Sequence, residues 1–179
     1  MRCLVTGGCG FIGSHLVARL RALGHQVTIW DIPDVLALPP RSPELPELWH
    51  LDLGADNLSG VEILEDLGID TVFHLAAVSR TLLAIADPRQ CHAVNAGGSL
   101  RLLERVRLFQ DATGRKCRVV LGSSNIVYGS PNPYKASKLA MEEYMSAYNA
   151  LYGLNCIALR YSNVYGPGMR WDDPICLAS

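Results

Sequence analysis

A tyrosine and a lysine in the second half of the chain have a spacing that suits proton transfer. Tyr134 and Lys138 are four residues apart in a segment with helical periodicity, so their side chains share one face. A phenol has a pKa of about 10, which a nearby ammonium lowers by favouring the phenolate. Ser124 follows an apolar run, where its hydroxyl can bind the same substrate oxygen. The trio predicts a site that exchanges a proton with a substrate hydroxyl, although a surface tyrosine beside a solvated lysine also produces this spacing.

A glycine-rich stretch near the N-terminus predicts the binding of a dinucleotide. Residues 6–13 lie between an apolar run and an amphipathic segment, which indicates a strand, a tight turn and a helix. A diphosphate lies against the positive N-terminal end of a helix only where the preceding turn has no obstructing side chains. Gly7, Gly8 and Gly10 keep that path clear, and Gly13 lets the helix lie close to its strand. An ordinary glycine-rich turn is the alternative, and the surrounding strand and helix pattern argues against it.

Two acidic residues further along are candidate contacts to the adenosine half of such a cofactor. Asp31 stands 18 residues after Gly13 at the end of the apolar run 27–30, where a carboxylate can accept hydrogen bonds from a ribose. Because a carboxylate repels a 2′-phosphate, Asp31 favours NAD. The positive nicotinamide of oxidised NAD would act together with Lys138 to lower the pKa of Tyr134. Asp52, with Leu53 beside it, is a candidate contact to the adenine. An aspartate that caps a turn explains Asp52 equally well.

Strand-like and helix-like segments alternate along the whole chain. A proline-rich connection over 32–47 is expected to be a surface loop, since proline lacks the donor that helices and central strands need. The alternation predicts an α/β domain with a doubly wound, mostly parallel sheet in three α/β/α layers, and ligands at the carboxyl ends of the strands. Adjacent glycines within 95–99 predict an interruption in a long helix. Strands are expected before Gly7 and over 27–30, 48–53, 71–77, 117–121 and 156–160, and helices after Gly10 and over 58–67, 88–110 and 134–152.

The end of the fourth predicted strand carries small residues that would let a cofactor pass close to the backbone. Ala76 and Ala77 follow Leu75 there, and all three are candidate cofactor contacts. His74 precedes them inside a continuous apolar run. Because no acid or nucleophile neighbours it in the sequence, His74 is expected to be a hydrogen-bonded core histidine rather than a catalytic group.

Length, composition and charge indicate one globular domain with a small-molecule ligand. The 179 residues are 49% hydrophobic and 18% charged, and the net charge of −1 leaves no basic patch for nucleic acid or a membrane surface. The 6 cysteines have neither a C-x-x-C pair nor a histidine at a metal-ligand spacing, so we expect core residues in a reducing compartment and no metal site. A strand that begins at residue 2 leaves no room for a signal peptide, and no run nears the ~18 apolar residues of a membrane span. We therefore expect a cytoplasmic protein.

Seven motifs occur in a fixed order along the chain. They are Thr6-Gly7-Gly8-Cys9-Gly10-Phe11-Ile12-Gly13, Asp31, His74-Leu75-Ala76-Ala77, Asn95 with Gly98-Ser99, Ser123-Ser124-x-x-Val127-Tyr128-Gly129, Pro133-Tyr134-x-x-x-Lys138 and Leu159-Arg160-Tyr161-x-Asn163-Val164-Tyr165-Gly166-Pro167. In this order the sequence resembles the extended short-chain dehydrogenase/reductases and, within them, the NAD-dependent nucleotide-sugar epimerase/dehydratase group. The resemblance covers essentially the whole chain and implies the Rossmann fold, with one NAD-binding domain over residues 1–179 that also carries the catalytic residues.

The resemblance also implies roles for individual residues. Ser124, Tyr134 and Lys138 would form the catalytic triad, and Lys138 would also hold the nicotinamide ribose. Ser124 and Asn163 would contact the sugar-nucleotide substrate. The remaining cofactor contacts that it implies are the amides of Phe11 and Ile12 at the diphosphate, Tyr161 near the nicotinamide, and Asn95, Leu75, Ala76 and Ala77.

The chemistry implied by the resemblance is oxidation of a sugar hydroxyl by NAD to a keto-sugar, followed in epimerases by return of the hydride to the other face. Dehydratases of the group have an acid pair beside the catalytic serine or threonine, whereas Asn125 and Ile126 follow Ser124 here, so 4,6-dehydration is not expected. Only residues 130–133 separate the Val-Tyr-Gly motif from the tyrosine of the triad, and the sequence stops at Ser179. In the family this connection is much longer, and a substantial region follows the Tyr-Gly-Pro motif. These two differences predict that the substrate domain is absent or truncated.

Three functions remain open from the sequence. The first is an NAD-dependent nucleotide-sugar epimerase, and the second is an NAD-binding Rossmann module with little or no turnover on its own. The third is a reductase of a small carbonyl compound that uses NADPH. Arg41 in the proline-rich connection favours the third function because it can approach a phosphate, whereas Asp31 weakens it.

The resemblance further implies a homodimer. The helices over 88–110 and 134–152 resemble those that pair in the family as a four-helix bundle. Tyr144, Met145 and Tyr148 would then supply apolar contacts, although packing inside a monomer explains these three residues nearly as well.

Overall fold

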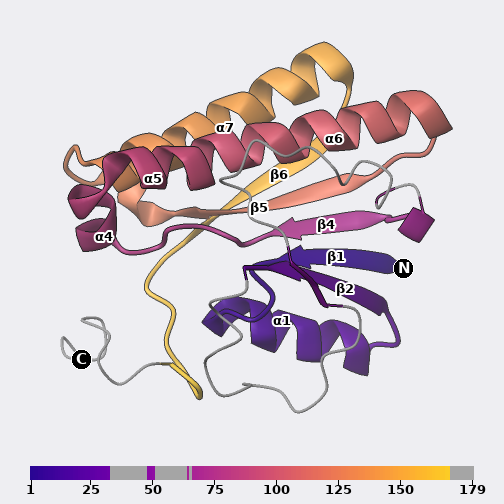
Figure 1. The fold of residues 1–179 in the computed structure, drawn as a ribbon, viewed down its shortest axis with the longest axis horizontal. Coiled ribbons are helices and arrows are strands. Elements are labelled where there is room, and N and C mark those ends of the chain that lie inside the picture. The colour runs from indigo at the N-terminus through magenta and orange to yellow at the C-terminus, as the bar shows by residue number, and fades with distance from the viewer. Residues whose placement is uncertain (33–47, 51–63, 65, 170–179) are drawn as a thin grey trace.

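The computed structural model describes residues 1–32, 48–50, 64 and 66–169, and a six-stranded parallel sheet lies at its centre (Figure 1). The strand order is β3-β2-β1-β4-β5-β6, so the sheet grows outward in both directions from β1. This is the doubly wound Rossmann arrangement that the sequence predicts. Its strands are β1 (Arg2–Thr6), β2 (Gln26–Asp31), β3 (Leu48–His50), β4 (Thr71–His74), β5 (Arg118–Ser124) and β6 (Asn155–Tyr161).

Helices cover both faces of the sheet, which completes the three layers. Figure 1 shows α1 below the sheet and α5, α6 and α7 above it. The helices are α1 (Phe11–Ala22), α4 (Thr81–Ala86), α5 (Pro88–His92), α6 (Gly98–Thr113) and α7 (Pro133–Tyr152), with a π-helical turn η1 (Ala93–Gly97) and a 3-10 turn η2 (Asn125–Tyr128). Among the residues described, no helix combines the length and the apolar character needed to cross a membrane.

Local sequence signals explain where the longer helices begin and end. Asn132 caps α7, because its side-chain oxygen accepts a hydrogen bond from the Lys135 amide at 2.9 Å, and Pro133 occupies the first helical position. The helix ends at Gly153, which has a φ of 64° that glycine adopts without strain. The interruption predicted within 95–99 is the π-helical turn η1, which joins α5 to α6. Turns of this kind occur often at functional sites.

Three predicted strands differ from those observed, and one of them, predicted over 117–121, is β5, which extends to Ser124. The apolar pattern predicts a strand over 71–77, but β4 ends at His74. Beyond it the Ala76 amide donates to the side-chain oxygen of Thr6 at 3.2 Å, which directs the chain toward the glycine-rich turn instead of along the sheet. The third strand is predicted over 48–53 and is described over Leu48–His50 as β3. The predicted adenine contacts Asp52 and Leu53 lie outside the described residues. Most of the helix predicted over 58–67 also lies outside them.

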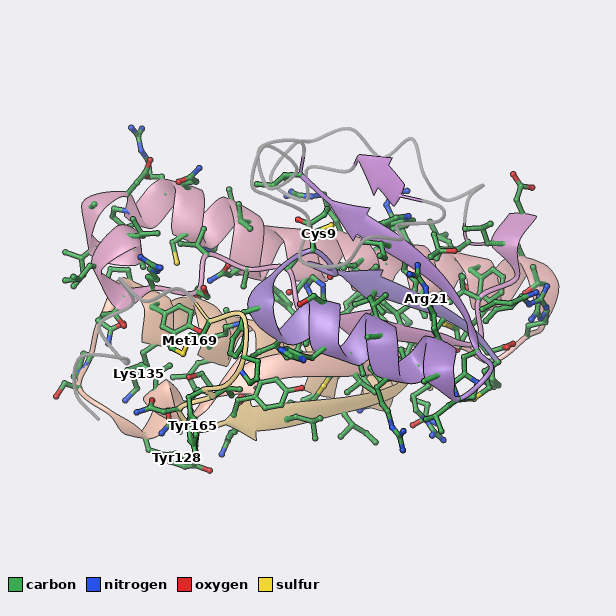
Figure 2. The ribbon with its side chains drawn as sticks, turned by 90° about the horizontal axis from the view of Figure 1, so that it is seen from below. Cys9, Arg21, Tyr128, Lys135, Tyr165 and Met169 are labelled. Atoms are coloured by element: carbon green, nitrogen blue, oxygen red, sulfur yellow. The ribbon has the colours of Figure 1, made fainter. Side chains whose placement is uncertain are left out.

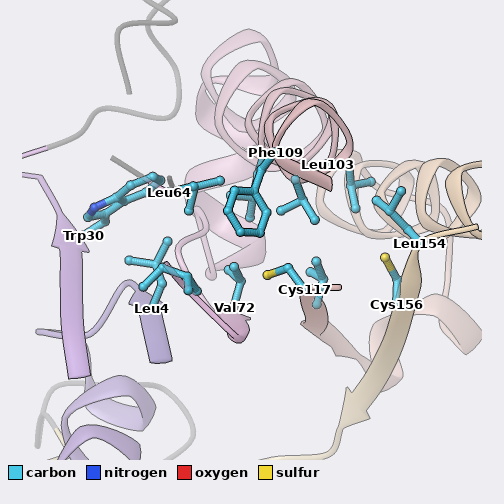
Figure 3. Packing of buried hydrophobic residues seen from close by; sticks show 13 residues of the cluster. Leu4, Trp30, Leu64, Val72, Leu103, Phe109, Cys117, Leu154 and Cys156 are labelled. Atoms are coloured by element: carbon cyan, nitrogen blue, oxygen red, sulfur yellow. The ribbon is translucent and has the colours of Figure 1, made fainter. Parts of the chain in front are cut away.

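Two hydrophobic clusters hold the layers together. The larger lies between the sheet and the α6 and α7 layer, where Leu4 and Val72 of the sheet pack beneath Phe109 and Leu103 of α6 (Figure 3). The smaller lies on the opposite face, where Val17 and the rest of the buried side of α1 contact β1 and β2. Three half-buried residues of α7, which are Tyr144, Met145 and Tyr148, pack against the larger cluster. Packing inside the monomer therefore accounts for their apolar character.

Candidate functional site

The glycine-rich turn is packed so closely that side chains are excluded from it. Gly7 has a φ of 71°, and a Cβ there would lie 2.7 Å from the Ala76 nitrogen. A Cβ on Gly13 would lie 2.1 Å from the carbonyl oxygen of Gly7, so α1 approaches the turn only because residue 13 is glycine. The turn thus contacts both α1 and the loop after β4. This arrangement brings three of the predicted cofactor-binding segments together.

The N-terminal end of α1 is suited to an anion. Gly10 occupies the cap position without a side-chain hydrogen bond, and the first turn contains no acidic residue. The amides of Phe11 and Ile12 belong to the group at a helix start that has no partner within the helix. Because these amides also lie at the positive end of the helix dipole, they fit the diphosphate that the sequence predicts.

Asp31 is bound to the glycine-rich turn. Its buried carboxylate accepts hydrogen bonds from the amide of Cys9 at 2.9 Å and from the amide of Ile32 at 2.9 Å, one on each oxygen. Each carboxylate oxygen has a second lone pair, which a ribose hydroxyl can use. Burial and the neighbouring Asp31 together raise the pKa of the Cys9 thiol to about 11, so this cysteine is a neutral part of the turn.

The loop after β4 is held by Asn95 from the π-helical turn. The side chain of Asn95 is fully buried, and its amide group accepts from the Val78 nitrogen at 2.7 Å and donates to the Val78 oxygen at 3.1 Å. The same group donates to the hydroxyl of Ser137 on α7 at 2.9 Å. Asn95 therefore links the half-buried loop residues 75–77, which are predicted cofactor contacts, to the helix that carries Tyr134 and Lys138.

His74 is a core residue, as the sequence predicts. Its two ring nitrogens lie 2.7 Å from the Thr6 hydroxyl and 2.9 Å from the Ser99 hydroxyl, and the ring is 1% exposed. Burial, and secondarily the charge of Lys138, lowers the pKa of His74 to about 3. The imidazole is therefore neutral and connects β4 to β1 and α6.

Tyr134 lies in the first turn of α7, where Ser124 at the end of β5 reaches it. The tyrosine is 8% exposed, and burial raises the pKa of its phenol above the ordinary value. A hydrogen bond with Ser124 acts in the opposite direction. The sequence predicts a lowered pKa from the ammonium of Lys138 and from the positive nicotinamide of an oxidised cofactor. In the protein without a cofactor, burial has the larger effect on this pKa, so the prediction for the NAD-bound site stays a prediction.

Lys138 is buried beside Tyr134. Its ammonium donates to the main-chain oxygen of Gly122 at 2.8 Å and lies 5.7 Å from the centre of the Tyr134 ring. Burial lowers the pKa of Lys138 to about 8, while Cys91 and Glu142 oppose this shift. An ammonium has three donors, so Lys138 retains capacity for ribose or substrate hydroxyls.

Leu75, which follows β4, and Tyr161 of β6 are two predicted cofactor contacts, and both lie beside Gly122. A Cβ on Gly122 would lie 3.0 Å from a methyl carbon of Leu75 and 3.4 Å from a ring carbon of Tyr161. Asn163 follows β6 and is exposed, so its side chain is accessible to a ligand. Among the described site residues, Ser124 and Tyr161 end strands, and Leu75, Ala76, Ala77 and Asn163 follow strand ends, where a doubly wound sheet binds its ligands.

A charged network next to the triad is not apparent from the sequence motifs. The hydroxyl of Ser123 donates to Glu142 at 2.5 Å, and Arg160 of β6 forms an ion pair with the same carboxylate at 2.5 Å. Arg160 also donates to the hydroxyl of Tyr128 and lies over that ring, 4.9 Å from its centre. The network joins β5, β6, η2 and α7 around the triad. Ser123, Tyr128 and Arg160 belong to the motifs, whereas Glu142, which joins them, is marked in the sequence by its position four residues after Lys138 on the same helical face.

The short connection before Tyr134 is a defined turn. The ammonium of Lys135 donates to the Gly129 oxygen at 2.5 Å, and the Asn132 side chain donates to the Ser130 oxygen at 3.0 Å. Figure 2 shows Lys135 and Tyr128 on the same side of the molecule. The brevity of this connection therefore does not prevent α7 from beginning where the triad requires it.

A parallel doubly wound sheet, a glycine-rich turn under α1 and an adjacent Ser-Tyr-Lys trio define a Rossmann-fold protein related to the short-chain dehydrogenases. The model of the NAD dependent epimerase/dehydratase family matches residues 3–174, and the chain belongs to this family. This finding confirms the resemblance stated from the motifs.

Individual relatives agree with that assignment. A UDP-glucose 4-epimerase from Mycolicibacterium smegmatis is 36% identical, with 93% of this chain and 57% of the relative covered. The crystal structure of the Thermus thermophilus UDP-glucose 4-epimerase in complex with NAD has a TM-score of 0.81 at 34% identity, with 98% of this chain and 59% of that chain covered. A 3 beta-hydroxysteroid dehydrogenase/Delta 5-->4-isomerase from Mycobacterium tuberculosis is 31% identical over 93% of this chain and 48% of its own length. The chain thus spans about half the length of the relatives that it matches, and those relatives differ in substrate.

Proposed function

We propose that the protein is an NAD-dependent nucleotide-sugar epimerase that oxidises a sugar hydroxyl to a keto-sugar and then reduces it from the opposite face. The observation that carries this proposal is the convergence of Ser124, Tyr134 and Lys138 at the sheet edge that also holds the glycine-rich turn. This arrangement puts a proton-transfer group and a dinucleotide site within reach of one substrate. The family assignment and the NAD bound to the Thermus thermophilus relative support it.

In this proposal the chain's own residues bind NAD and move one proton. The amides of Phe11 and Ile12 bind the diphosphate, Asp31 accepts hydrogen bonds from the adenosine ribose, and the ammonium of Lys138 binds the nicotinamide ribose. NAD, when bound, supplies the hydride acceptor and donor, together with a positive nicotinamide that lowers the pKa of a nearby phenol.

The proton path involves Tyr134 and Ser124. The phenolate of Tyr134 takes the proton of the sugar hydroxyl during oxidation, and the phenol returns it to the carbonyl oxygen during reduction. Ser124 holds that oxygen in place through a hydrogen bond. Because Asn125 and Ile126 follow Ser124 in η2, the acid pair of a dehydratase is missing from this position, which favours epimerisation over 4,6-dehydration.

The substrate class in this proposal is a sugar joined to a nucleoside diphosphate, with Asn163 as one of its contacts. The experiment is a turnover assay of the purified chain with NAD and UDP-, GDP-, CDP- and dTDP-sugars. Epimer formation is measured by chromatography and reduced nicotinamide by absorbance. Conversion of one sugar nucleotide, lost in Tyr134→Phe, is the expected result, and absence of conversion with NAD shown to be bound would refute the proposal for this chain.

A second candidate is an NAD-binding module with little or no turnover on its own. The observation that favours it is coverage, because this chain spans 57% of the Mycolicibacterium smegmatis relative and 48% of the Mycobacterium tuberculosis relative. A module of this kind would bind NAD through residues 6–13 and Asp31 and leave every sugar nucleotide unchanged. The same turnover assay, with NAD binding measured in parallel, separates the two candidates.

We also propose a homodimer formed by α6 and α7. Three large apolar side chains remain exposed on these helices. Their exposed fractions are 40% for Leu108, 73% for Leu151 and 50% for Tyr152. Burial of such side chains stabilises association. A dimeric mass by light scattering at micromolar concentration is expected, and a monomeric mass would refute the homodimer.

A further inference from the structure

The segment that follows β6 extends to the first turn of α1. Residues 162–169 leave β6 at one edge of the sheet and meet the helix that follows β1, with β4 and β5 lying between these two strands. Figure 1 shows this segment in yellow as it descends from β6. In Figure 2, Tyr165 and Met169 lie toward the end of the molecule at which α1 begins, and Met169 is drawn nearer to the helix. The segment therefore links the half of the sheet that carries the triad to the half that carries the glycine-rich turn.

Two side chains of α1 make this connection. The ring nitrogen Nε2 of His15 lies 2.8 Å from the main-chain oxygen of Pro167, so it donates a hydrogen bond to that carbonyl. Phe11 packs edge-on against the His15 ring, with centroids 5.5 Å apart and an interplanar angle of 88°. A Cβ on Gly166 would lie 3.8 Å from the Phe11 ring. We call the His15 and Phe11 contacts to residues 166 and 167 the α1 latch.

The latch holds the backbone of the segment and leaves its polar side chains free. The Met169 amide donates to the Gly166 oxygen at 3.1 Å, which closes a turn at the point of contact. Asn163 is exposed, and Tyr165 is 83% exposed. The segment is thus fixed by β6 at one end and by α1 at the other, with Asn163 between the two supports.

We infer that His15 is a positioning residue that couples the placement of residues 162–169 to the binding of the NAD diphosphate. The inference rests on the proposed function, which assigns the amide of Phe11 to that diphosphate. A diphosphate that orders the first turn of α1 also orders the Phe11 and His15 rings, and these rings hold the segment. Coupling of this kind is reciprocal, so the latched segment also favours NAD. Asn163 is then positioned for a sugar nucleotide chiefly after NAD has bound.

Amide hydrogen exchange over residues 162–169 measures the latch with and without NAD. His15→Ala removes the donor, and His15→Gln retains an N–H group at a similar reach. Arg19→Ala is the matched control, because Arg19 is exposed one turn further along the same face of α1. From the usual strength of one hydrogen bond, we expect roughly two- to tenfold faster exchange in His15→Ala than in the wild type, His15→Gln and Arg19→Ala. We also expect NAD to slow this exchange in the wild type and to do so less in His15→Ala, with a matching loss of NAD affinity.

Three outcomes separate the latch from the cofactor assignment. Equal exchange in wild type and His15→Ala without NAD would overturn the latch, whatever the cofactor does. Equal slowing by NAD in both proteins would overturn the coupling through His15. A wild-type chain that does not bind NAD would refute the proposed cofactor and the coupling, while the comparison without NAD still decides whether the latch exists.

Discussion

The ammonium of Lys138 donates a hydrogen bond to the main-chain oxygen of Gly122 at 2.8 Å, which ties helix α7 to strand β5 beside the triad. Because this lysine is 3% exposed, its charge is removed from water, and burial lowers its pKa from 10.5 to about 8. One group thus holds α7 against β5 and has a pKa of about 8. The same desolvation gives a pH dependence of stability that can be measured.

Between pH 8 and 10.5 the unfolded chain binds a proton that the folded chain has released from Lys138, so stability rises with pH in this window. We expect the free energy of unfolding in urea to increase by up to about 1.4 kcal/mol per pH unit above pH 8, relative to Lys138→Met. Tyr134 and the buried cysteines have raised pKa values and act in the opposite direction at higher pH, so the difference between the two proteins is the quantity to measure. Parallel pH profiles for wild type and Lys138→Met would contradict the lowered pKa.

Replacement of the triad tyrosine separates chemistry from cofactor binding. Tyr134→Phe removes one hydroxyl from a buried ring, and we expect turnover to fall by at least about a hundredfold because the proton carrier is lost. NAD affinity should stay within about threefold of the wild type, since the glycine-rich turn is unchanged. Tyr144→Phe on the same helix is the matched control and should retain activity. Sustained turnover in Tyr134→Phe would mean that another group carries the proton.

The approach of α1 to the glycine-rich turn depends on Gly13. A Cβ at this position would lie 2.1 Å from the Gly7 oxygen, so Gly13→Ala must displace the helix or the turn. We expect a loss of about 1–3 kcal/mol in unfolding free energy and a strong loss of NAD affinity. Gly97→Ala serves as the control, because its Cβ would make ordinary contacts, with the end of the Arg101 side chain at 3.4 Å and the His92 carbonyl oxygen at 3.7 Å. Wild-type NAD binding by Gly13→Ala would show that the diphosphate lies elsewhere.

The choice between NAD and its 2′-phosphorylated form tests Asp31. NADH at a hundred times its dissociation constant should raise the free energy of unfolding of the wild type by about 2.7 kcal/mol, and NADPH at the same concentration should raise it less. Asp31→Asn keeps an oxygen for the Cys9 or Ile32 amide but lacks the negative charge, so the preference for NADH should shrink. Thermal unfolding with each cofactor measures both effects. Equal protection of the wild type by NADH and NADPH would exclude the assignment of NAD as the preferred cofactor.

Much of the sheet follows from the sequence because each element has a local signal. The apolar runs before Gly7 and over 27–30 and 156–160 correspond to β1, β2 and β6, and the glycines of 95–99 indicate the break at η1. The early end of β4 has no local signal, and just beyond it the Ala76 amide donates to the Thr6 side chain instead of to a backbone carbonyl. Contacts between residues that are distant in the sequence decide such strand boundaries, and hydrophobic periodicity gives no information about these contacts.

For the site, too, local spacing predicts some features, whereas others depend on contacts between distant segments. Spacing places Tyr134 and Lys138 on one face of α7, and the structure agrees. The direction of the Tyr134 pKa shift without a cofactor depends on burial by neighbouring elements, which spacing in the sequence does not reveal. The links from Asn95 to Val78 and from His15 to Pro167 join segments that are 17 and 152 residues apart, which only the folded chain reveals.

The central claim is hydride removal and return through NAD, and mass spectrometry of product formed in D2O tests it most directly. The wild-type chain is incubated with NAD and the sugar nucleotide that it converts, and deuterium is measured at the inverted carbon. An epimer without deuterium at that carbon is predicted, because the hydride leaves the sugar and returns to it without exchange with solvent. An epimer that carries solvent deuterium there, or no epimer from a protein with NAD bound, would contradict the account.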